Sequence, residues 1–211
     1  MRGRFITLEG LEGCGKSTQL PLLKAWLEER GQTVTATREP GGTPLAERIR
    51  ELVLSSTSEK VPVECELLLV FAARATHLAN LIRPALDNGT WVLCDRFTDA
   101  TYAYQGAGRG IPEAHIRALH SLVHGDLQPD LTLLIDVPVA VGLERARVRR
   151  GAASRDRFEV EQDDFFERVR ANFLARARAE ANRIKVIDGT QSIEQVTAAV
   201  QQHVARLLGS G

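Results

Sequence analysis

The chain has 211 residues, of which 44% are hydrophobic, and it carries 27 basic and 27 acidic side chains. This length suffices for one substantial core and is short for two, so we expect a single domain over residues 1–211. A net charge of zero is atypical of a general nucleic-acid-binding protein, and we expect no nucleic-acid partner.

The cysteines and the apolar segments indicate where the protein works. Cys14, Cys65 and Cys94 are widely separated and lack the spacing of a disulfide framework or a zinc site, which fits a reducing compartment. The longest apolar run, residues 67–73, is too short to span a membrane, and the N-terminus has no apolar secretion segment. We therefore expect a cytoplasmic protein without a membrane partner.

Five apolar runs along the chain are typical of strands, and helical patterns lie between them. We expect the strands at residues 4–9, 33–38, 91–95, 131–136 and 184–188. Strands that alternate with helices predict an α/β fold, in which helices cover both faces of a five-stranded parallel sheet. Ligands of such a sheet bind at the carboxyl ends of its strands.

The first run leads into the sequence Gly-Leu-Glu-Gly-Cys-Gly-Lys-Ser at residues 10–17, and a helical pattern follows. Strand, glycine-rich loop and helix together predict a phosphate-binding loop of the P-loop NTPase type, whose backbone N–H groups surround a polyphosphate. We expect Lys16 to reach the β- and γ-phosphates and Ser17 to hold Mg²⁺. The predicted nucleotide-binding residues here are Gly10, Leu11, Glu12, Gly13, Cys14, Gly15, Lys16, Ser17 and Thr18.

This motif alone does not separate a switch GTPase, an ATP-driven machine and a small-molecule kinase. The run at residues 91–95 ends in Asp95 and continues with Arg96. Asp95 is suited to hold Mg²⁺ or its water, or to receive a proton from an acceptor, and Arg96 is suited to bind phosphate. For Asp136, which ends the next run, we expect mainly a helix-capping role.

Six arginines lie between residues 145 and 157, interrupted by Gly-Ala-Ala-Ser at residues 151–154. They could form a solvated helix face, an RNA-binding patch, or a lid whose guanidinium groups close over a triphosphate. Only the lid, placed at about residues 145–159, makes use of the phosphate loop. An RNA-binding module would rest on this segment alone, and the Asn-Lys-x-Asp guanine reader of a switch GTPase is absent from the sequence.

Further motifs complete the pattern: Thr-Arg-Glu-Pro-Gly-Gly-Thr at 37–43, Phe-Ala-Ala-Arg at 71–74, Asp-Arg-Phe at 95–97, Tyr-Gln-Gly at 104–106 with Arg-Gly at 109–110, and Asp-Arg-Phe-Glu at 156–159. With the phosphate loop, they resemble the bacterial thymidylate kinases, P-loop nucleoside monophosphate kinases, over essentially the whole chain. The resemblance implies a three-layer fold with a short lid and transfer of a phosphoryl group from ATP, with Mg²⁺, to dTMP. A kinase for another small acceptor is the closest alternative.

Members of this family keep a catalytic basic residue either in the phosphate loop or in the lid. Glu12 occupies the loop position, so the resemblance implies the lid-arginine branch. We choose Arg149 and Arg157 as its catalytic arginines and leave open a share for Arg150 or Arg155. The full predicted catalytic set is Lys16, Asp95, Arg96, Arg149 and Arg157.

The acceptor site also follows from the resemblance. It implies that Phe71 stacks on thymine and that Arg74 hydrogen-bonds its O4 atom, although spacing alone would make Phe71 a core residue and Arg74 a surface charge. Thr101 and Gln105 match positions near the base. Tyr104 matches the aromatic ring beneath the sugar, which favours deoxyribose.

The remaining predictions concern phosphate, metal, adenine and assembly. Glu39 and Arg48 should face the acceptor phosphate and Mg²⁺, which makes Ser17, Asp95 and Glu39 the predicted metal ligands; for Arg48 a plain surface role is equally favoured. Gln191 matches a position beside adenine, where an ordinary turn is the alternative. We expect the five histidines to be structural. The helix around residues 67–70 is apolar nearly all round, which favours a homodimer.

Overall fold

Five short strands form the central sheet of the protein, which a computed structural model describes over residues 2–55, 59–150 and 161–208. They are β1 (Phe5–Glu9), β2 (Val34–Arg38), β3 (Trp91–Asp95), β4 (Leu131–Asp136) and β5 (Ile184–Asp188). Every pairing is parallel and the order is β2-β3-β1-β4-β5. The predicted α/β fold with its five-stranded parallel sheet is confirmed, and the predicted strands match to within one residue.

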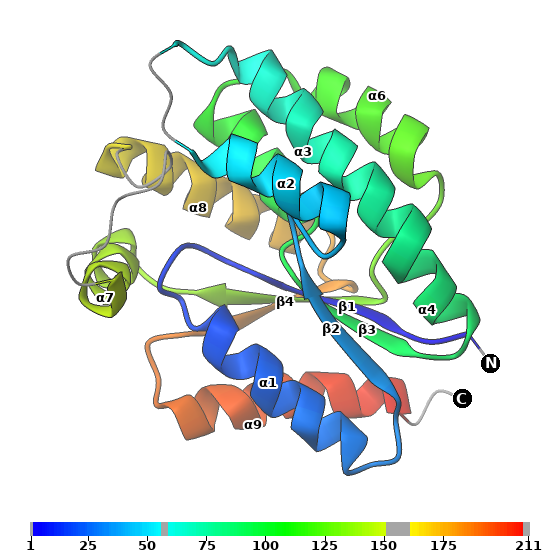
Figure 1. The fold of residues 1–211 in the computed structure, drawn as a ribbon. Helices are drawn as coiled ribbons and strands as arrows, with labels where there is room; N and C mark the ends of the chain where they lie inside the picture. The colour runs from blue at the N-terminus through cyan, green and yellow to red at the C-terminus, as the bar shows by residue number, and fades with distance from the viewer. Residues whose placement is uncertain (1, 56–58, 151–160, 209–211) are drawn as a thin grey trace.

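Helices cover both faces of this sheet (Figure 1). On one face lie α1 (Lys16–Glu28) and α9 (Ile193–Leu208), and the opposite face carries α3 (Val63–His77), α4 (Arg83–Asp87) and α8 (Asp163–Ala179). Outside α3 lie α2 (Pro44–Leu54) and α6 (Glu113–His124), and α7 (Val139–Arg150) follows β4. Two π-helical segments, η1 (Leu78–Ile82) and η2 (Tyr102–Gly108), continue α3 and the short α5 (Thr98–Thr101).

The core follows from strands that are buried on both faces. Every residue of β1 is buried, as an apolar run in the middle of a parallel sheet requires. Leu23 and Leu27 of α1 and Val200 and Val204 of α9 pack with the sheet in one apolar cluster. The outer strands β2 and β5 are less buried than β1, and each has exposed residues among its side chains.

One continuous helical stretch, Val63–Asp87, is long and apolar enough by length and composition to cross a membrane. Half of its most apolar window is buried inside the protein, and it packs between the sheet, α2 and α6 (Figure 1). It therefore has the burial of a core helix.

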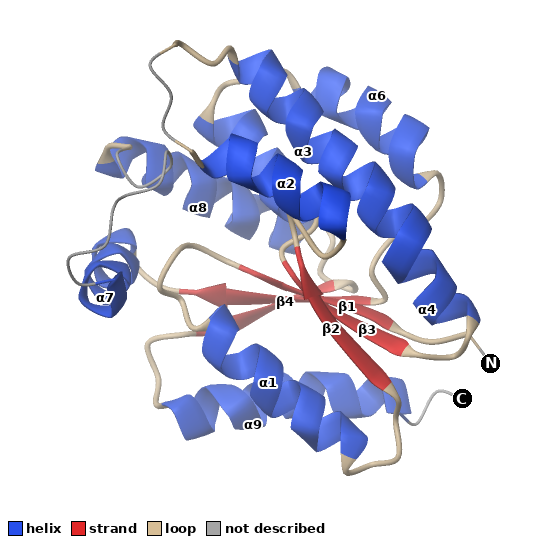
Figure 2. Ribbon diagram, in the orientation of Figure 1, coloured by secondary structure: helices blue, strands red, loops and turns tan. Residues whose placement is uncertain are grey.

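The carboxyl ends of β1, β3 and β2 lie side by side, with loops leaving from this edge (Figure 2). Asp95 pairs in register with Leu8 on one side and Arg38 on the other. The loop after β1 also packs against α7: a Cβ atom on Gly13, whose φ is +70°, would lie 2.1 Å from the carbonyl oxygen of Gly142. Glycine at this position lets α7, which carries the first lid arginines, approach the phosphate loop.

Candidate active site

The phosphate loop borders a cavity of about 410 Å³ lined by Gly13, Gly15, Lys16 and Ser17, and by Asp95 from β3. The Lys16 ammonium is 7% exposed and donates hydrogen bonds to the carbonyl oxygens of Gly10 (3.1 Å) and Leu11 (2.9 Å). Its charge is thus held within the loop, where phosphate oxygens can compete for it. Cys14 and Thr18 of the same loop region border another cavity, which Gln191 also lines.

The side chain of Arg96 contacts two residues of the phosphate loop. Its guanidinium donates to Gly10 O (3.0 Å), to Glu12 Oε1 (2.8 Å) and to the Tyr104 hydroxyl (3.1 Å). Arg96 has a φ of +70°, and no other non-glycine residue in the described ranges has a positive φ. Such a conformation costs of the order of 1–3 kcal/mol, so the surrounding contacts hold this turn in place.

Glu12 brings a negative charge to a loop that is built for anions. Burial opposes its ionisation, but the charges of Arg96 and Lys16 outweigh burial and lower the pKa of Glu12 to about 2. Arg149 of α7 adds a third positive charge, 3.9 Å from the other carboxylate oxygen. Glu12 is therefore ionised at neutral pH and holds two arginines at the phosphate loop.

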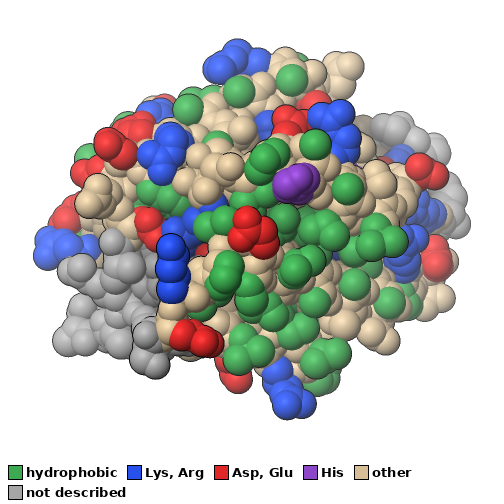
Figure 3. Space-filling view, turned by 90° about the horizontal axis from the view of Figure 1, so that it is seen from above, with side chains coloured by type: hydrophobic (Ala, Val, Ile, Leu, Met, Phe, Trp, Pro, Cys, Tyr) green, Lys and Arg blue, Asp and Glu red, His purple; other side chains and the backbone are tan. Residues whose placement is uncertain are grey.

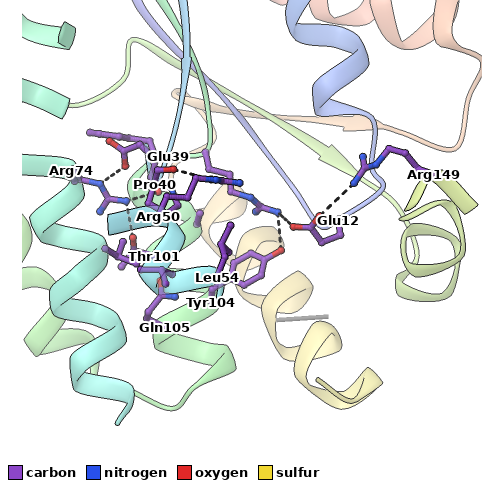
Figure 4. A pocket seen from close by; sticks show the side chains of 15 residues that line it. Glu12, Glu39, Pro40, Arg50, Leu54, Arg74, Thr101, Tyr104, Gln105 and Arg149 are labelled. Atoms are coloured by element: carbon purple, nitrogen blue, oxygen red, sulfur yellow. Dashed lines mark hydrogen bonds and ion pairs between the residues drawn. The ribbon is translucent and has the colours of Figure 1, made fainter. Parts of the chain in front are cut away.

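A second cavity, of about 260 Å³, opens beside the first, and Arg74 of α3 lines it, at the left in Figure 4. Arg74 is 1% exposed. Its Nε donates to Glu39 Oε2 (2.5 Å), and its Nη2 donates to Thr101 Oγ1 (2.9 Å) and to the carbonyl oxygen of Phe97 (3.1 Å). Three hydrogen bonds fix the guanidinium plane, yet Nη1 is buried without a partner. A buried donor of this kind calls for an acceptor from a ligand.

The two cavities share part of their lining. Five residues border both of them: Glu12, Glu39, Arg50, Arg96 and Arg149. A polyphosphate on the loop and a second molecule beside Arg74 would thus meet at a wall made mainly of arginines. This arrangement suits the transfer of a phosphoryl group, because such a reaction needs alignment and positive charge more than an acid or a base.

Known proteins share this fold and these motifs. A family model described as thymidylate kinase matches residues 8–200. The thymidylate kinases of Pseudomonas syringae pv. tomato and Teredinibacter turnerae are 56% and 54% identical to the chain over 208 residues, covering 99% of it and 98% and 100% of themselves. The crystal structure of thymidylate kinase from Ehrlichia chaffeensis superposes with a TM-score of 0.77 and 34% identity, covering 97% of this chain and 99% of that one. The chain belongs to the thymidylate kinase family.

Phosphorylation of dTMP to dTDP is therefore its reaction, and an acceptor site was predicted for dTMP. Of the residues predicted for it, Glu39, Arg74, Arg96, Thr101, Tyr104 and Gln105 line the second cavity. Gln105 is held by its amide group, which donates to the buried carboxylate of Glu66 at 2.9 Å. Tyr104 lines the cavity beside Arg96, which donates to its hydroxyl, and burial raises the pKa of its phenol, so the hydroxyl stays neutral.

Phe71, which was predicted to stack on thymine, does not line the second cavity. Its ring packs in an apolar cluster with Leu67, Tyr102 and Ile116. The physical reason is helical geometry: each residue turns about 100° further around α3, and it is Val70, one turn before Arg74, that faces the cavity. The aromatic ring that lines the cavity beside Arg74 is Phe97, with its ring centroid 5.1 Å from the guanidinium carbon.

Arg48 is exposed and lines neither cavity, whereas Arg50 lines both and donates to the carbonyl oxygen of Pro40 at 2.8 Å. Side chains two positions apart on a helix point about 200° away from each other, so only one of these two arginines can face the site. Arg50 is the residue that sequence reasoning missed.

Magnesium was predicted at Ser17, Asp95 and Glu39. Asp95 fits a metal, because its Oδ1 atom is buried without a hydrogen-bond partner at the cavity that Ser17 also lines. Glu39 fits less well: it is 3% exposed, and its two oxygens already accept bonds from Arg74 and His77. Among the described residues, no group of three or more His, Cys, Asp or Glu side chains could hold a metal.

Residues 145–150 of the predicted lid belong to α7. Arg149 lines both cavities and lies near Glu12, and Arg145 donates to Gly189 O at 2.8 Å, next to the turn that holds Gln191. Gln191 is itself held by Asp188, which accepts from its amide at 2.7 Å. Arg155 and Arg157 lie outside the described residues, as does most of the predicted lid at 145–159. Their role stays a prediction.

Asp136 does not act as the predicted helix cap. Its two carboxylate oxygens accept a pair of hydrogen bonds from Arg170 of α8, both 2.8 Å long. The pair joins the end of β4 to α8, a contact between residues 34 positions apart that the local pattern could not indicate.

Proposed function

We propose that the chain transfers the γ-phosphoryl group of ATP to dTMP with Mg²⁺, and that the two adjoining cavities hold the donor and the acceptor. Residues 10–18 would bind the triphosphate, and the turn with Gln191 would lie beside adenine. Lys16 would leave the carbonyl oxygens of its own loop for the β- and γ-phosphates. Ser17 and Asp95 would hold Mg²⁺, which bridges phosphate oxygens and offsets their charge when bound.

Thymine would be recognised by Arg74, which lines the acceptor cavity and whose buried Nη1 has no hydrogen-bond partner. A donor at this position meets the O4 acceptor of thymine or uracil but would face the amino group of cytosine. Val70, Phe97 and Thr101 would surround the base, and Tyr104 would lie under the sugar. The acceptor phosphate would then point towards Arg50 and Arg96, the two cations on the wall shared with the phosphate loop.

Transfer itself would depend on guanidinium charge from the lid. Glu12 holds Arg149 near the loop, and Arg157 is proposed to join it. These groups would offset the negative charge that spreads over the phosphoryl group in flight and would help to exclude water. Neither Asp95 nor a histidine needs to act as a strong base, since phosphoryl transfer rests on alignment and charge.

We also infer that the protein is a cytoplasmic homodimer. Leu45 and Leu52 of α2 and Leu68 of α3 are 52%, 60% and 57% exposed. These helices lie on the side seen from above in Figure 3, where hydrophobic side chains gather into a broad patch. Covering this patch with a second copy would remove apolar surface from water. Sedimentation at micromolar concentration should give a dimer, and Leu52→Glu should shift it towards the monomer.

The shared wall of the two cavities is the observation that carries the proposal. Its test is to mix the protein with ATP, Mg²⁺ and dTMP, separate the nucleotides by chromatography and measure dTDP and ADP in equal amounts. Lys16→Ala should abolish the product, and Lys24→Ala, a change in a surface side chain of the same helix, should leave it unchanged. Equal dTDP formation by both variants would contradict the assignment of the donor site.

A further inference from the structure

His77 is a buried side chain that lies behind the acceptor cavity and does not line it. It is 0% exposed and ends α3 one turn after Arg74. Its Nδ1 lies 3.0 Å from Glu39 Oε1, and its Nε2 lies 2.7 Å from Thr37 Oγ1. Since a carboxylate can only accept, Nδ1 carries the proton and donates it to Glu39; in the neutral ring Nε2 accepts from the hydroxyl of Thr37.

The same carboxylate holds Arg74. Glu39 Oε2 accepts from Arg74 Nε, so each oxygen of Glu39 has one fixed partner. The result is a buried chain of contacts from Thr37 through His77 and Glu39 to Arg74. Each of the last three is at most 3% exposed. A carboxylate held on one oxygen only could rotate, and the guanidinium plane would then rotate with it.

The orientation of that plane decides where the free Nη1 points. Thr101 and the carbonyl oxygen of Phe97 hold Nη2 from the other side. Nη1 alone is left for a ligand, and a hydrogen bond weakens steeply when its donor turns away from the acceptor. The loop that follows Glu39 adds a further constraint, because a Cβ on Gly42 would come within 2.4 Å of both His77 Nε2 and Thr37 Oγ1.

We propose that His77 is a positioning residue for base selection: through Glu39 it fixes the guanidinium of Arg74 so that the enzyme distinguishes a 4-oxo pyrimidine from a 4-amino pyrimidine. The inference rests on the proposed acceptor site. It assigns a role to a histidine that sequence analysis took as structural, and it makes Glu39 part of base recognition rather than a metal ligand.

The test compares dTMP with 5-methyl-dCMP, which keeps the methyl group and differs in the 4-amino group and in the loss of the N3 proton that accompanies it. For each protein, kcat/KM is measured for both acceptors at saturating ATP, together with the KM for ATP. His77→Leu should reduce the preference for dTMP by about tenfold or more, mainly through a higher KM for dTMP, with the KM for ATP unchanged. His77→Asn keeps a donor near the position of Nδ1 and should stay within about threefold of the unaltered enzyme.

Two further variants separate positioning from folding. His203→Leu removes a partly buried histidine of α9, on the other face of the sheet, and should change neither the preference nor the KM for dTMP. Thr37→Val removes the hydroxyl at Nε2 and should lower the preference by a smaller factor than His77→Leu. If His77→Leu does not fold, the preference of Thr37→Val decides: a value equal to that of the unaltered enzyme overturns the proposal.

The outcomes also separate this inference from the proposed function. If the unaltered enzyme does not prefer dTMP over 5-methyl-dCMP, the acceptor site itself is wrongly assigned. If it does prefer dTMP and folded His77→Leu retains the full preference, the site stands and the role of His77 is refuted. An equal loss of activity on both acceptors, with their ratio unchanged, would likewise show a structural role only.

Discussion

Glu9 gives the most quantitative prediction, because it is a carboxylate that folding buries completely. It ends β1, is 0% exposed, and accepts hydrogen bonds from the backbone N–H groups of Phe97 (2.7 Å) and Ala100 (3.3 Å), while its Oε2 has no partner. Burial, aided by the charge of Asp99, raises the pKa of Glu9 from 4.5 to about 7, against the opposing effect of Arg96 and Lys16.

The sign and size of the effect follow from linkage. A raised pKa means that the folded protein binds the proton more tightly than the unfolded chain, so this group stabilises the fold most below pH 4.5 and loses that contribution as the pH rises to about 7. A shift of roughly 2.5 pKa units corresponds to about 3 kcal/mol. Glu9→Gln resembles the protonated form at every pH, because its amide oxygen can still accept from Phe97.

The assay is urea unfolding of both proteins from about pH 4.5 to pH 8, at one ionic strength. Over this range the free energy of unfolding of Glu9→Gln should rise by about 3 kcal/mol relative to the unaltered protein. Glu113→Gln, at an exposed pair with Arg117, should follow the unaltered protein throughout. Parallel curves for Glu9→Gln and the unaltered protein would show that Glu9 titrates normally and would refute the reasoning.

Two further predictions concern selectivity and stability. Because thymine and uracil share the O4 acceptor and differ by one methyl group, worth about 0.8 kcal/mol, dUMP should be used about fourfold less efficiently than dTMP, whereas dCMP should lose up to about 10⁴-fold in kcat/KM. Similar rates with dUMP and dCMP would contradict the role of Arg74. Asp99→Ala should lower the free energy of unfolding by about 3–5 kcal/mol in urea titrations, since Asp99 is 2% exposed and pairs with Arg176 and Arg183; a loss below about 1 kcal/mol would mean that this network adds little.

The fold and the phosphate loop could be predicted because their signals are local. Residues 10–17 are consecutive, and the five strands are short apolar runs whose boundaries lie at the next turn or helix. The side chains of the acceptor cavity are different, because β2, α3 and α5 meet there from distant parts of the chain. The contact between Glu39 and Arg74 spans 35 positions and has no local signature.

The predicted residues of the acceptor cavity and the residues that line it differ where the choice depends on the face of a helix. Phe71 and Val70, like Arg48 and Arg50, are near neighbours in sequence that point in different directions, and only packing decides which one faces the cavity. Spacing alone predicts that Phe71 is a core residue, and its place in an apolar cluster agrees with this. The resemblance to the family replaced this prediction with stacking on thymine. His77 carried no signal, since one histidine on an apolar helix is most simply a core residue.

The charge supplied by α7 and the lid is the central claim of the account, and the rate of dTDP formation tests it most directly. Arg149→Ala, alone and with Arg157→Ala, should reduce kcat by about 10³- to 10⁵-fold at saturating ATP and dTMP. Arg147→Ala is the matched control, because Arg147 lies on the same helix, is largely exposed and pairs only with Glu144 in the described structure. We predict that the control keeps the full rate. An undiminished rate in the double variant would contradict the account.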